Sequence, residues 1–265
     1  MPELAEIKIM AEYINSSCQD QDFTSISVSA AVSHRLALVT PSDLQVFTIH
    51  AESRGKELKL LLNKGYSTEE ELSISMGMSG FWKFCKENEE RPKHTHLKFN
   101  TANLGSLCLV DARRFAKWRW KTDSTNRGPC PVSEFEDFKK NIYSSLNKKL
   151  FKKPIHLLLM DQRYFNGIGN YLRAEILYRA GQDPFESADT AILNNPNLLD
   201  LCKTIPIESY YIGGGQLKDW KNPFEVQPSG FNEWIQCYGK SDSSIVDKNG
   251  RVLWYFKDQL NTSHI

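Results

Sequence analysis

Apolar residues recur at helical spacing at the very start of the chain. Leu4, Ile7, Ala11 and Ile14 follow one another at intervals of three or four, and this pattern predicts an amphipathic helix over residues 3–16. Short runs rich in Val, Ile, Leu and Phe come next, broken by Pro, Gly, Asn and Asp, which is typical of strands joined by turns. The predicted strands cover residues 23–32, 35–40, 44–50, 56–63, 71–77, 95–100 and 105–111. Strands this short and this numerous favour a two-sheet sandwich.

A polar stretch rich in Gly and Pro, residues 121–133, interrupts these patterns and predicts a domain boundary. We place the linker at residues 123–132, between an N-terminal domain (1–122) and a C-terminal domain (133–265). A length of 265 residues with 40% apolar residues suits two domains of roughly 100–150 residues each.

Charge and composition narrow the class of protein. The net charge is only +1, but residues 139–153 carry six lysines and no acid, which predicts a local basic patch for a polyanion; a solvated helix face is the alternative. No apolar run is long enough for a membrane span, and the acidic N-terminus does not resemble a signal peptide. We therefore expect a soluble intracellular protein with no membrane partner.

The six cysteines are scattered, with no C-x-x-C pair and no histidine at ligand spacing. Neither a disulfide framework nor a zinc site is predicted, and the thiols are expected to be reduced. We expect no cofactor and no bound metal.

The first six residues carry candidate chemistry. If the initiator methionine is removed, Pro2 becomes a free secondary amine, with Glu3 beside it and Glu6 one helical turn further on. A secondary amine that attacks a sugar aldehyde forms an iminium that cannot lose its charge, so it withdraws electrons until a neighbouring C–O bond breaks. The alternative is that Pro2 merely occupies the first turn of a helix, where proline is favoured.

Four further motifs accompany this N-terminus: Met76-Gly77-Met78-Ser79-Gly80, Lys93-His94-Thr95-His96, Asp111-Ala112-Arg113-Arg114-Phe115, and the segment 158–177 with Asp161-Gln162 and Gly167-Ile168-Gly169-Asn170. Together with Pro2-Glu3-Leu4-Ala5-Glu6, they resemble the formamidopyrimidine-DNA glycosylase and endonuclease VIII family over almost the entire chain. The last segment resembles that family's helix–two-turn–helix. The same hairpin occurs in some RNA-binding ribosomal proteins, so alone it indicates nucleic-acid binding more than catalysis.

The resemblance implies a set of catalytic residues. Pro2 would be the nucleophile, Glu3 would protonate the sugar ring oxygen, and Glu6 would order the site or support proton transfer. Lys56, in the Arg54-Gly55-Lys56 context, would be the active-site lysine, although a lysine at a strand start is more often solvated. Arg251 would reach the lesion phosphate and assist elimination.

The resemblance also implies DNA contacts. Met78 would fill the void left by a flipped nucleotide, and His94 would contact a phosphate. Arg113 would face the orphaned base, Arg114 would bind backbone phosphate, and Phe115 would wedge between bases. The remaining DNA-binding candidates are Asn170, expected to cap the helix whose N-terminus receives a phosphate, and Lys218 in a short glycine-rich loop.

The C-terminal region departs from the bacterial pattern. Where bacterial members carry four cysteines around zinc, residues 234–265 hold only Cys237, so zinc is excluded on ligand count. The Asn-Gly pair at 249–250, followed by an apolar run, predicts a β-hairpin. This region resembles the zincless finger of the animal endonuclease VIII-like branch.

We therefore predict an α+β fold: an N-terminal two-sheet β-sandwich with an N-terminal helix, then a helical domain with a helix–two-turn–helix and a zincless finger. The predicted function is a bifunctional DNA glycosylase and AP lyase of base excision repair that removes oxidised bases, with pyrimidine lesions preferred. It would act through a Schiff base at the N-terminal proline and cleave the strand by β/δ-elimination. Its partner would be damaged double-stranded DNA, with single-stranded DNA as a second form, and it would act as a monomer in the nucleus or another DNA-containing compartment. The alternatives are a non-catalytic nucleic-acid-binding protein and a tautomerase that uses its N-terminal proline as a base.

Overall fold

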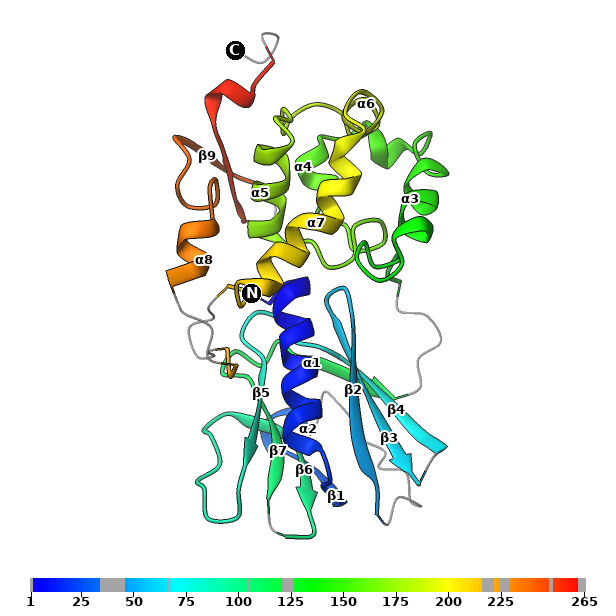
Figure 1. Ribbon diagram of the computed structural model, residues 1–265, viewed down its shortest axis with the longest axis vertical. Coiled ribbons are helices and arrows are strands. Elements are labelled where there is room, and N and C mark those ends of the chain that lie inside the picture. Colours follow the sequence, from blue (N-terminus) through cyan, green and yellow to red (C-terminus); the bar gives the residue numbers. More distant parts are fainter. Residues whose placement is uncertain are drawn as a thin grey trace. The chain divides into compact units, whose positions relative to one another are not determined.

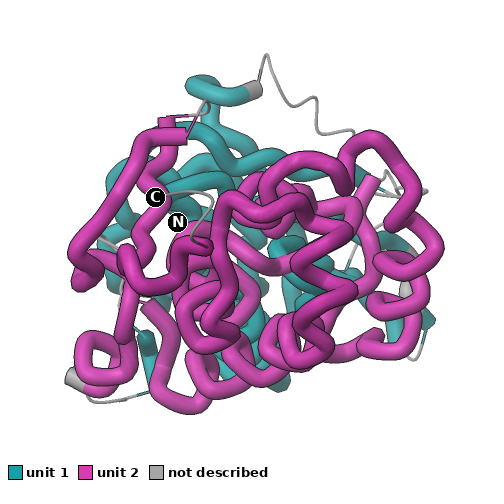
Figure 2. Tube along the Cα trace, turned by 90° about the horizontal axis from the view of Figure 1, so that it is seen from above, with its two compact units in different colours: residues 1–2, 6–123, 216–225 teal, residues 3–5, 124–215, 226–265 magenta. Residues whose placement is uncertain are grey.

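The computed structural model describes residues 2–33, 46–65, 67–103, 105–120, 126–215, 222–224, 229–247 and 250–261. The chain divides into two compact units (Figure 2). Unit 1 comprises residues 1–2, 6–123 and 216–225, and unit 2 comprises residues 3–5, 124–215 and 226–265. Of the predicted linker, residues 126–132 are described, and they lie in unit 2.

Unit 1 contains two four-stranded antiparallel sheets (Figure 1). The first has the order β1-β6-β7-β5, with β1 Phe23–Val28, β6 Thr95–Thr101, β7 Ser106–Val110 and β5 Phe81–Cys85. The second has the order β2-β3-β4-β8, with β2 Thr48–Arg54, β3 Glu57–Lys64, β4 Ser67–Ser75 and β8 Lys117–Trp120. The predicted two-sheet sandwich is confirmed.

Helix α1, Leu4–Cys18, is fastened to both sheets of unit 1. The Asn15 side chain exchanges two hydrogen bonds with the backbone of Ala51 in β2, at 2.9 and 2.6 Å, and Tyr13 Oη accepts from the Phe84 N–H of β5 at 2.9 Å. The apolar positions of the predicted helix, such as Ile7 and Ile14, are buried. The helix that begins at the N-terminus is therefore a structural member of the sandwich core.

Several strands differ from the prediction. The predicted strand 23–32 ends at Val28 and is followed by α2, Ala30–Ser33, while 35–40 lies outside the described residues. Strands β5 and β8 were not predicted, because each depends on a distant partner: β5 pairs with β7 and β8 pairs with β4. Four residues such as those of β8 carry too little alternation to be detected locally.

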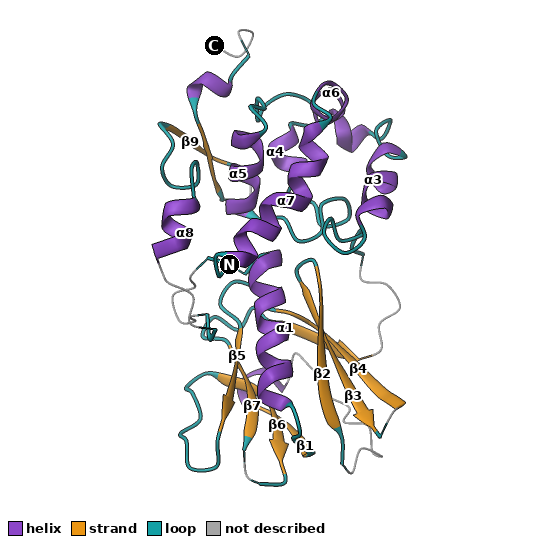
Figure 3. Cartoon of the chain, viewed as in Figure 1, coloured by secondary structure: helices purple, strands orange, loops and turns teal. Residues whose placement is uncertain are grey.

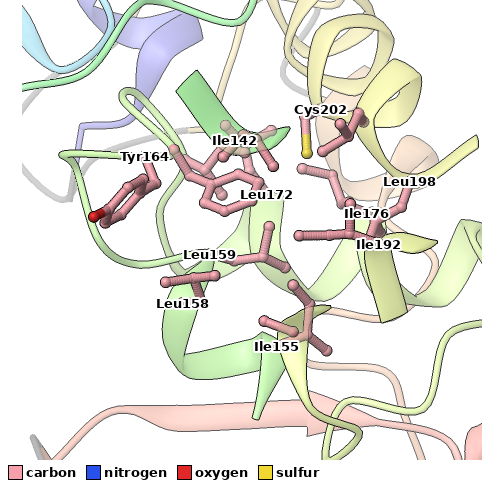
Figure 4. Close-up of a cluster of buried hydrophobic side chains, with 14 of the residues drawn as sticks. Ile142, Ile155, Leu158, Leu159, Tyr164, Leu172, Ile176, Ile192, Leu198 and Cys202 are labelled. Carbon is pink, nitrogen blue, oxygen red and sulfur yellow. The ribbon is translucent and has the colours of Figure 1, made fainter. Parts of the chain in front are cut away.

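Unit 2 is mainly helical (Figure 3). Its helices are α3 Phe135–Tyr143, η1 Lys149–Lys152, α4 Ile155–Leu158, α5 Asn170–Arg179, α6 Ala188–Asn194, α7 Asn197–Tyr211, α8 Ser229–Trp234 and η2 Lys257–Gln259. Strands β9 Ser243–Val246 and β10 Val252–Tyr255 form the predicted C-terminal hairpin. The core is a cluster of buried side chains from these helices, including Ile142, Leu159, Leu172, Ile176 and Leu198 (Figure 4).

The segment between α4 and α5 is the predicted helix–two-turn–helix. Gln162 holds its two turns together, because its side chain accepts from the Gly167 N–H at 3.0 Å and donates to the Ile168 carbonyl at 2.9 Å. Gly167 has a φ of +106°, a conformation that other residues rarely adopt. The motif Asp161-Gln162 with Gly167-Ile168-Gly169 is thus a backbone device that sets the start of α5.

Candidate active site and nucleic-acid interface

The carboxylate of Asp111 joins two loops of unit 1. Its Oδ1 accepts from Ser79 Oγ at 2.5 Å and from the Arg113 N–H at 3.2 Å, and its Oδ2 accepts from the Ala116 N–H at 2.7 Å. Asp111 is 1% exposed. Because Ser79 follows β4, and Arg113 and Ala116 follow β7, one buried carboxylate orders both the Gly-Met-Ser-Gly loop and the Asp-Ala-Arg-Arg-Phe loop.

The tips of these two loops carry exposed apolar side chains. Met78 is 42% exposed and Phe115 is 48% exposed. The Arg113 guanidinium lies 4.9 Å from the centre of the Phe115 ring. Gly77 has a φ of +62°, and a Cβ there would lie 2.7 Å from the Phe115 backbone, so only glycine permits this approach of the loops. Met78, Arg113 and Phe115, the three side chains predicted from the sequence to enter the DNA duplex, therefore lie on adjoining loops.

His94 and Arg114 are exposed and have unusual backbone conformations. Their φ angles are +66° and +56°; among the described residues, the other non-glycine residue with a positive φ is Asp20. Strained backbone of this kind persists where neighbouring contacts hold it, and it is concentrated at functional sites. Here the holding contacts come from Asp111, whose N–H donates to the His94 carbonyl and whose carbonyl accepts from the Arg114 N–H.

Glu3 lies at the N-terminus of α5. Its two carboxylate oxygens accept hydrogen bonds from the backbone N–H groups of Tyr171 at 3.1 Å and Leu172 at 3.3 Å, and Glu3 is 2% exposed. The next residue, Leu4, donates its N–H to the Gly167 carbonyl at 3.1 Å. The helix–two-turn–helix thus orients the residue that follows Pro2.

This arrangement corrects the predicted role of Asn170 as a helix cap. The N-cap is Gly169, Asn170 is the first residue of α5, and the Glu3 carboxylate accepts from backbone N–H groups at the helix N-terminus. The side-chain amide of Asn170 donates instead to the Val252 carbonyl of β10 at 2.9 Å. A glycine N-cap leaves the first N–H groups of α5 for Glu3.

The other predicted catalytic residues occupy defined places. Pro2 is buried, and Glu6 lies in the first turn of α1, 1% exposed. Lys56 follows Gly55 in the two-residue connection between β2 and β3, where Arg54 pairs with Glu57. Pro2, Glu6 and Lys56 belong to unit 1, and Glu3, Asn170 and Arg251 belong to unit 2. Lys218 lies outside the described residues.

Arg251 lies at the turn of the C-terminal hairpin. Its backbone N–H donates to Asp247 Oδ1 at 3.0 Å, and its carbonyl accepts from the Asp247 N–H at 2.8 Å. The other oxygen of that carboxylate, Oδ2, lies 3.3 Å from Arg173 Nη1 of α5. A buried ion pair therefore connects the helix–two-turn–helix to the turn that presents Arg251.

Glu175 secures the segment that leads into the hairpin. Its carboxylate accepts from the backbone N–H groups of Gln236 at 3.0 Å and of Cys237 and Tyr238 at 2.8 Å each. Sequence reasoning missed Arg173, Glu175 and Asp247 as organising residues. Glu175 was detectable, since it is a fixed position of the helix–two-turn–helix pattern; Arg173 and Asp247 gave no local signal.

The hydrogen bonds of Glu175 and the Arg173–Asp247 ion pair attach the hairpin region to α5. Within the described ranges, no three His, Cys, Asp or Glu side chains lie close enough together to hold a metal ion. Burial raises the pKa of Cys237 to about 12, so its thiol stays protonated, and Sγ donates to the Trp254 carbonyl at 3.4 Å.

The predicted basic patch is partly neutralised. Lys139 lies 3.2 Å from Glu136, and Lys152 forms an ion pair with Asp189. Lys140, Lys148, Lys149 and Lys153 are exposed. No helix among the described residues is both long and apolar enough to cross a bilayer.

Comparison with known proteins identifies the family. Residues 1–118 match the formamidopyrimidine-DNA glycosylase N-terminal domain, residues 128–206 match the H2TH domain of the same glycosylase, and residues 228–258 match the DNA-binding region of endonuclease VIII-like 1. Human endonuclease 8-like 1 is 36% identical, over 97% of this chain and 73% of that protein. The formamidopyrimidine-DNA glycosylase of Marinobacter nauticus is 28% identical, over 94% of this chain and 92% of that protein.

Solved structures show the same fold. A Lactococcus lactis Fpg mutant in complex with Fapy-dG containing DNA aligns with a TM-score of 0.82 at 23% identity, over 98% of this chain and 100% of that one. Fold and sequence together define a DNA glycosylase and AP lyase of base excision repair. The chain belongs to the formamidopyrimidine-DNA glycosylase and endonuclease VIII family, and its relatives include the endonuclease 8-like 1 proteins, so the family identified from the motifs is confirmed.

Proposed function

We propose that this enzyme removes oxidised bases, with a preference for pyrimidine lesions, by attack of the Pro2 nitrogen on C1′ of a flipped nucleotide. The observation that carries the proposal is the placement of Glu3. Its carboxylate is fixed by two backbone N–H groups of α5, directly beside the residue that supplies the amine. Pro2 is buried as well, and once Met1 is removed it supplies a secondary amine next to this acid, a pairing suited to covalent catalysis at a sugar.

The chemistry proceeds in two stages. The Pro2 nitrogen forms a bond to C1′ as the glycosidic bond breaks, and the base leaves with the bonding electrons and takes up a proton. The Pro2 nitrogen gives up the proton of its secondary amine, so that its lone pair can form the iminium in the next step. Glu3 delivers a proton to the sugar ring oxygen, the C1′–O bond opens, and an iminium joins Pro2 to the sugar. Loss of a proton from C2′ then expels the 3′ phosphate by β-elimination, a second elimination expels the 5′ phosphate, and water releases the product from Pro2.

The remaining candidates support these steps. Glu6 orders the site or assists proton transfer, Lys56 hydrogen-bonds the lesion phosphate or donates a proton, and Arg251 binds the lesion phosphate and assists elimination. Met78 fills the space left by the flipped nucleotide, Arg113 faces the orphaned base, and Phe115 wedges between bases. The DNA backbone is bound by His94, Arg114 and Asn170, and Lys218 belongs to the glycine-rich loop near the lesion base. In this scheme residues 1–122 form an N-terminal catalytic domain, residues 123–132 a linker, and residues 133–265 a C-terminal DNA-binding domain. The substrate is damaged DNA in a DNA-containing compartment, bound by a monomer without a cofactor.

The two rival functions make different predictions. A non-catalytic binding protein retains DNA affinity and forms no covalent intermediate, whereas a tautomerase uses Pro2 as a base and needs no DNA. Sodium borohydride reduction in the presence of a duplex with an abasic site separates the three. We expect a covalent protein–DNA adduct with the wild-type protein and none with Pro2→Gly or with retained Met1, while both variants still bind the duplex. Equal trapping by Pro2→Gly would contradict the proposed mechanism.

A further inference from the structure

Unit 1 has a polar pocket beside β1 and β6 that none of the proposed catalytic steps uses. Its lining residues are Ser27, Val28, Ser29, Arg91, Thr95, His96 and Lys98. Arg91 and Lys98 contribute two positive charges, and none of the described residues that line the pocket is acidic. A pocket with this lining attracts an anion.

His96 has a ring nitrogen without a partner. The side chain is 6% exposed, and its Nε2 lies 3.0 Å from the Asp111 carbonyl oxygen. Because a carbonyl oxygen only accepts, Nε2 carries the hydrogen, and Nδ1 is left buried with no hydrogen-bond partner. A buried polar atom without a partner is uncommon in folded proteins, and His96 is one of the residues that line the pocket.

The serine hydroxyls of the pocket are arranged as donors. Ser29 Oγ accepts from the Ala31 N–H at 3.3 Å, and Ser27 Oγ accepts from Asn100 Nδ2 at 3.4 Å. Each hydroxyl therefore uses a lone pair within the protein and can direct its hydrogen to a ligand. Arg91 Nη1 donates to the carbonyls of Lys86 at 2.9 Å and Glu89 at 2.5 Å, which fixes the guanidinium.

These groups suit a tetrahedral oxyanion. Two cations and two hydroxyl donors match the several acceptor oxygens of a phosphate. His94, a proposed DNA contact, lies two residues from His96 in the sequence, and the Asp111 backbone hydrogen-bonds to both. A backbone phosphate of DNA therefore fits better than a free one.

We propose that this pocket binds one backbone phosphate of duplex DNA outside the lesion nucleotide. This inference rests on the proposed function, and it adds Arg91 and Lys98 to the proposed DNA-binding residues of unit 1.

The test compares the double variant Arg91→Ala/Lys98→Ala with the charge-matched control Arg119→Ala/Lys59→Ala, whose cations pair with Glu57 at 3.6 Å and Glu71 at 3.1 Å on the other sheet. Binding to an abasic duplex is measured by fluorescence anisotropy over a range of salt concentrations. The slope of log affinity against log salt should become shallower by about 1 in the pocket variant and stay unchanged in the control. Equal slopes for both variants and the wild type would overturn the proposal.

A methylphosphonate scan of the duplex identifies the phosphate. Neutralising one phosphate outside the lesion should weaken binding by the wild type and have no effect on the pocket variant. The other source of a phosphate is the free ion, so inorganic phosphate is titrated into the DNA-free protein while the NMR resonances of the His96 imidazole are followed. A response to inorganic phosphate together with an unchanged methylphosphonate profile would also overturn the proposal. Borohydride trapping by the wild type is measured separately. Absence of trapping would contradict the proposed function, whereas an unchanged salt slope in the pocket variant would contradict the phosphate site.

Discussion

Arg173 Nη1 lies 3.3 Å from Asp247 Oδ2, and the two side chains are 0% and 1% exposed. The pair joins α5, whose N-terminus holds Glu3, to the hairpin turn that carries Arg251. Burial lowers the pKa of Arg173, and the hydrogen bond to Asp247 acts in the opposite direction. A buried charge of this kind is stable only with its partner in place.

Asp247→Ala should therefore destabilise the protein strongly. It leaves the Arg173 guanidinium buried without its carboxylate and removes the acceptor of the Arg251 N–H, which together should lower the free energy of unfolding by about 3–5 kcal/mol. Urea unfolding measures the change. The control is Glu71→Ala, which breaks the exposed pair with Lys59 and should cost about 1 kcal/mol or less. A similar cost for both variants would show that the buried pair has no special role.

His156 should make stability depend on pH. Burial, with a further contribution from Arg173, lowers the pKa of His156 from 6.5 to about 4. Below about pH 6.5 the unfolded chain binds a proton at His156, whereas the folded chain does not. The contribution of His156 to the free energy of unfolding is therefore complete above that pH and is lost as the pH falls towards 4. In urea unfolding, the wild type should lose stability relative to His156→Gln by about 1 kcal/mol per pH unit between pH 6.5 and 4. The variant of an exposed histidine, His50→Gln, should follow the wild type; parallel curves for all three proteins would contradict this expectation.

The parts of the fold that depend on local pattern could be predicted from the sequence. The helix at the N-terminus follows from the spacing of Leu4, Ile7 and Ile14, and the C-terminal hairpin follows from its turn residues. Strands β5 and β8 could not be predicted, since their stability depends on pairing with distant strands.

The same distinction holds for the site. The motifs identified the loops that carry Met78 and Phe115, but the carboxylate contacts that order the site connect residues far apart in the chain. The hydrogen-bond partners of Glu3, Tyr171 and Leu172, lie 168 and 169 positions further along the chain, and Arg173 lies 74 positions from Asp247. Periodicity and spacing in a sequence do not reveal pairings over such distances. The placement of Glu3 and the attachment of the C-terminal hairpin to α5 were therefore seen only in the structure.

Asp111→Asn should break the hydrogen bonds that connect the loop of Met78 to the loop of Arg113 and Phe115. The substitution replaces one carboxylate oxygen by an NH₂ group, which cannot accept from both Ser79 and Ala116, and the expected loss of stability is about 1–3 kcal/mol. If Met78, Arg113 and Phe115 occupy the void at a flipped nucleotide, the affinity for an abasic duplex should fall more than the affinity for undamaged duplex. Anisotropy titrations with both duplexes measure this ratio. The control is the exposed Asp22→Asn, and a ratio that matches the control would refute the coupling.

Arg251→Ala tests the lesion preference. The variant should slow excision or strand cleavage of thymine glycol without improving 8-oxoguanine opposite cytosine, because a pyrimidine that has lost aromaticity stacks poorly and is less costly to flip. Single-turnover rates on duplexes that differ only in the lesion measure both effects, with the neighbouring Lys257→Ala as the control. A wild-type rate for 8-oxoguanine equal to or above that for thymine glycol would overturn the preference and leave the lyase mechanism intact.

The identity of the attacking atom is the most direct test of the mechanism. The complex of wild-type protein with an abasic duplex is reduced with borohydride, digested with a protease, and the modified peptide is sequenced by mass spectrometry. We expect the sugar remnant on the nitrogen of Pro2, in a peptide that lacks Met1. A remnant on Lys56, or DNA that binds fully without any adduct, would contradict Pro2 as the nucleophile.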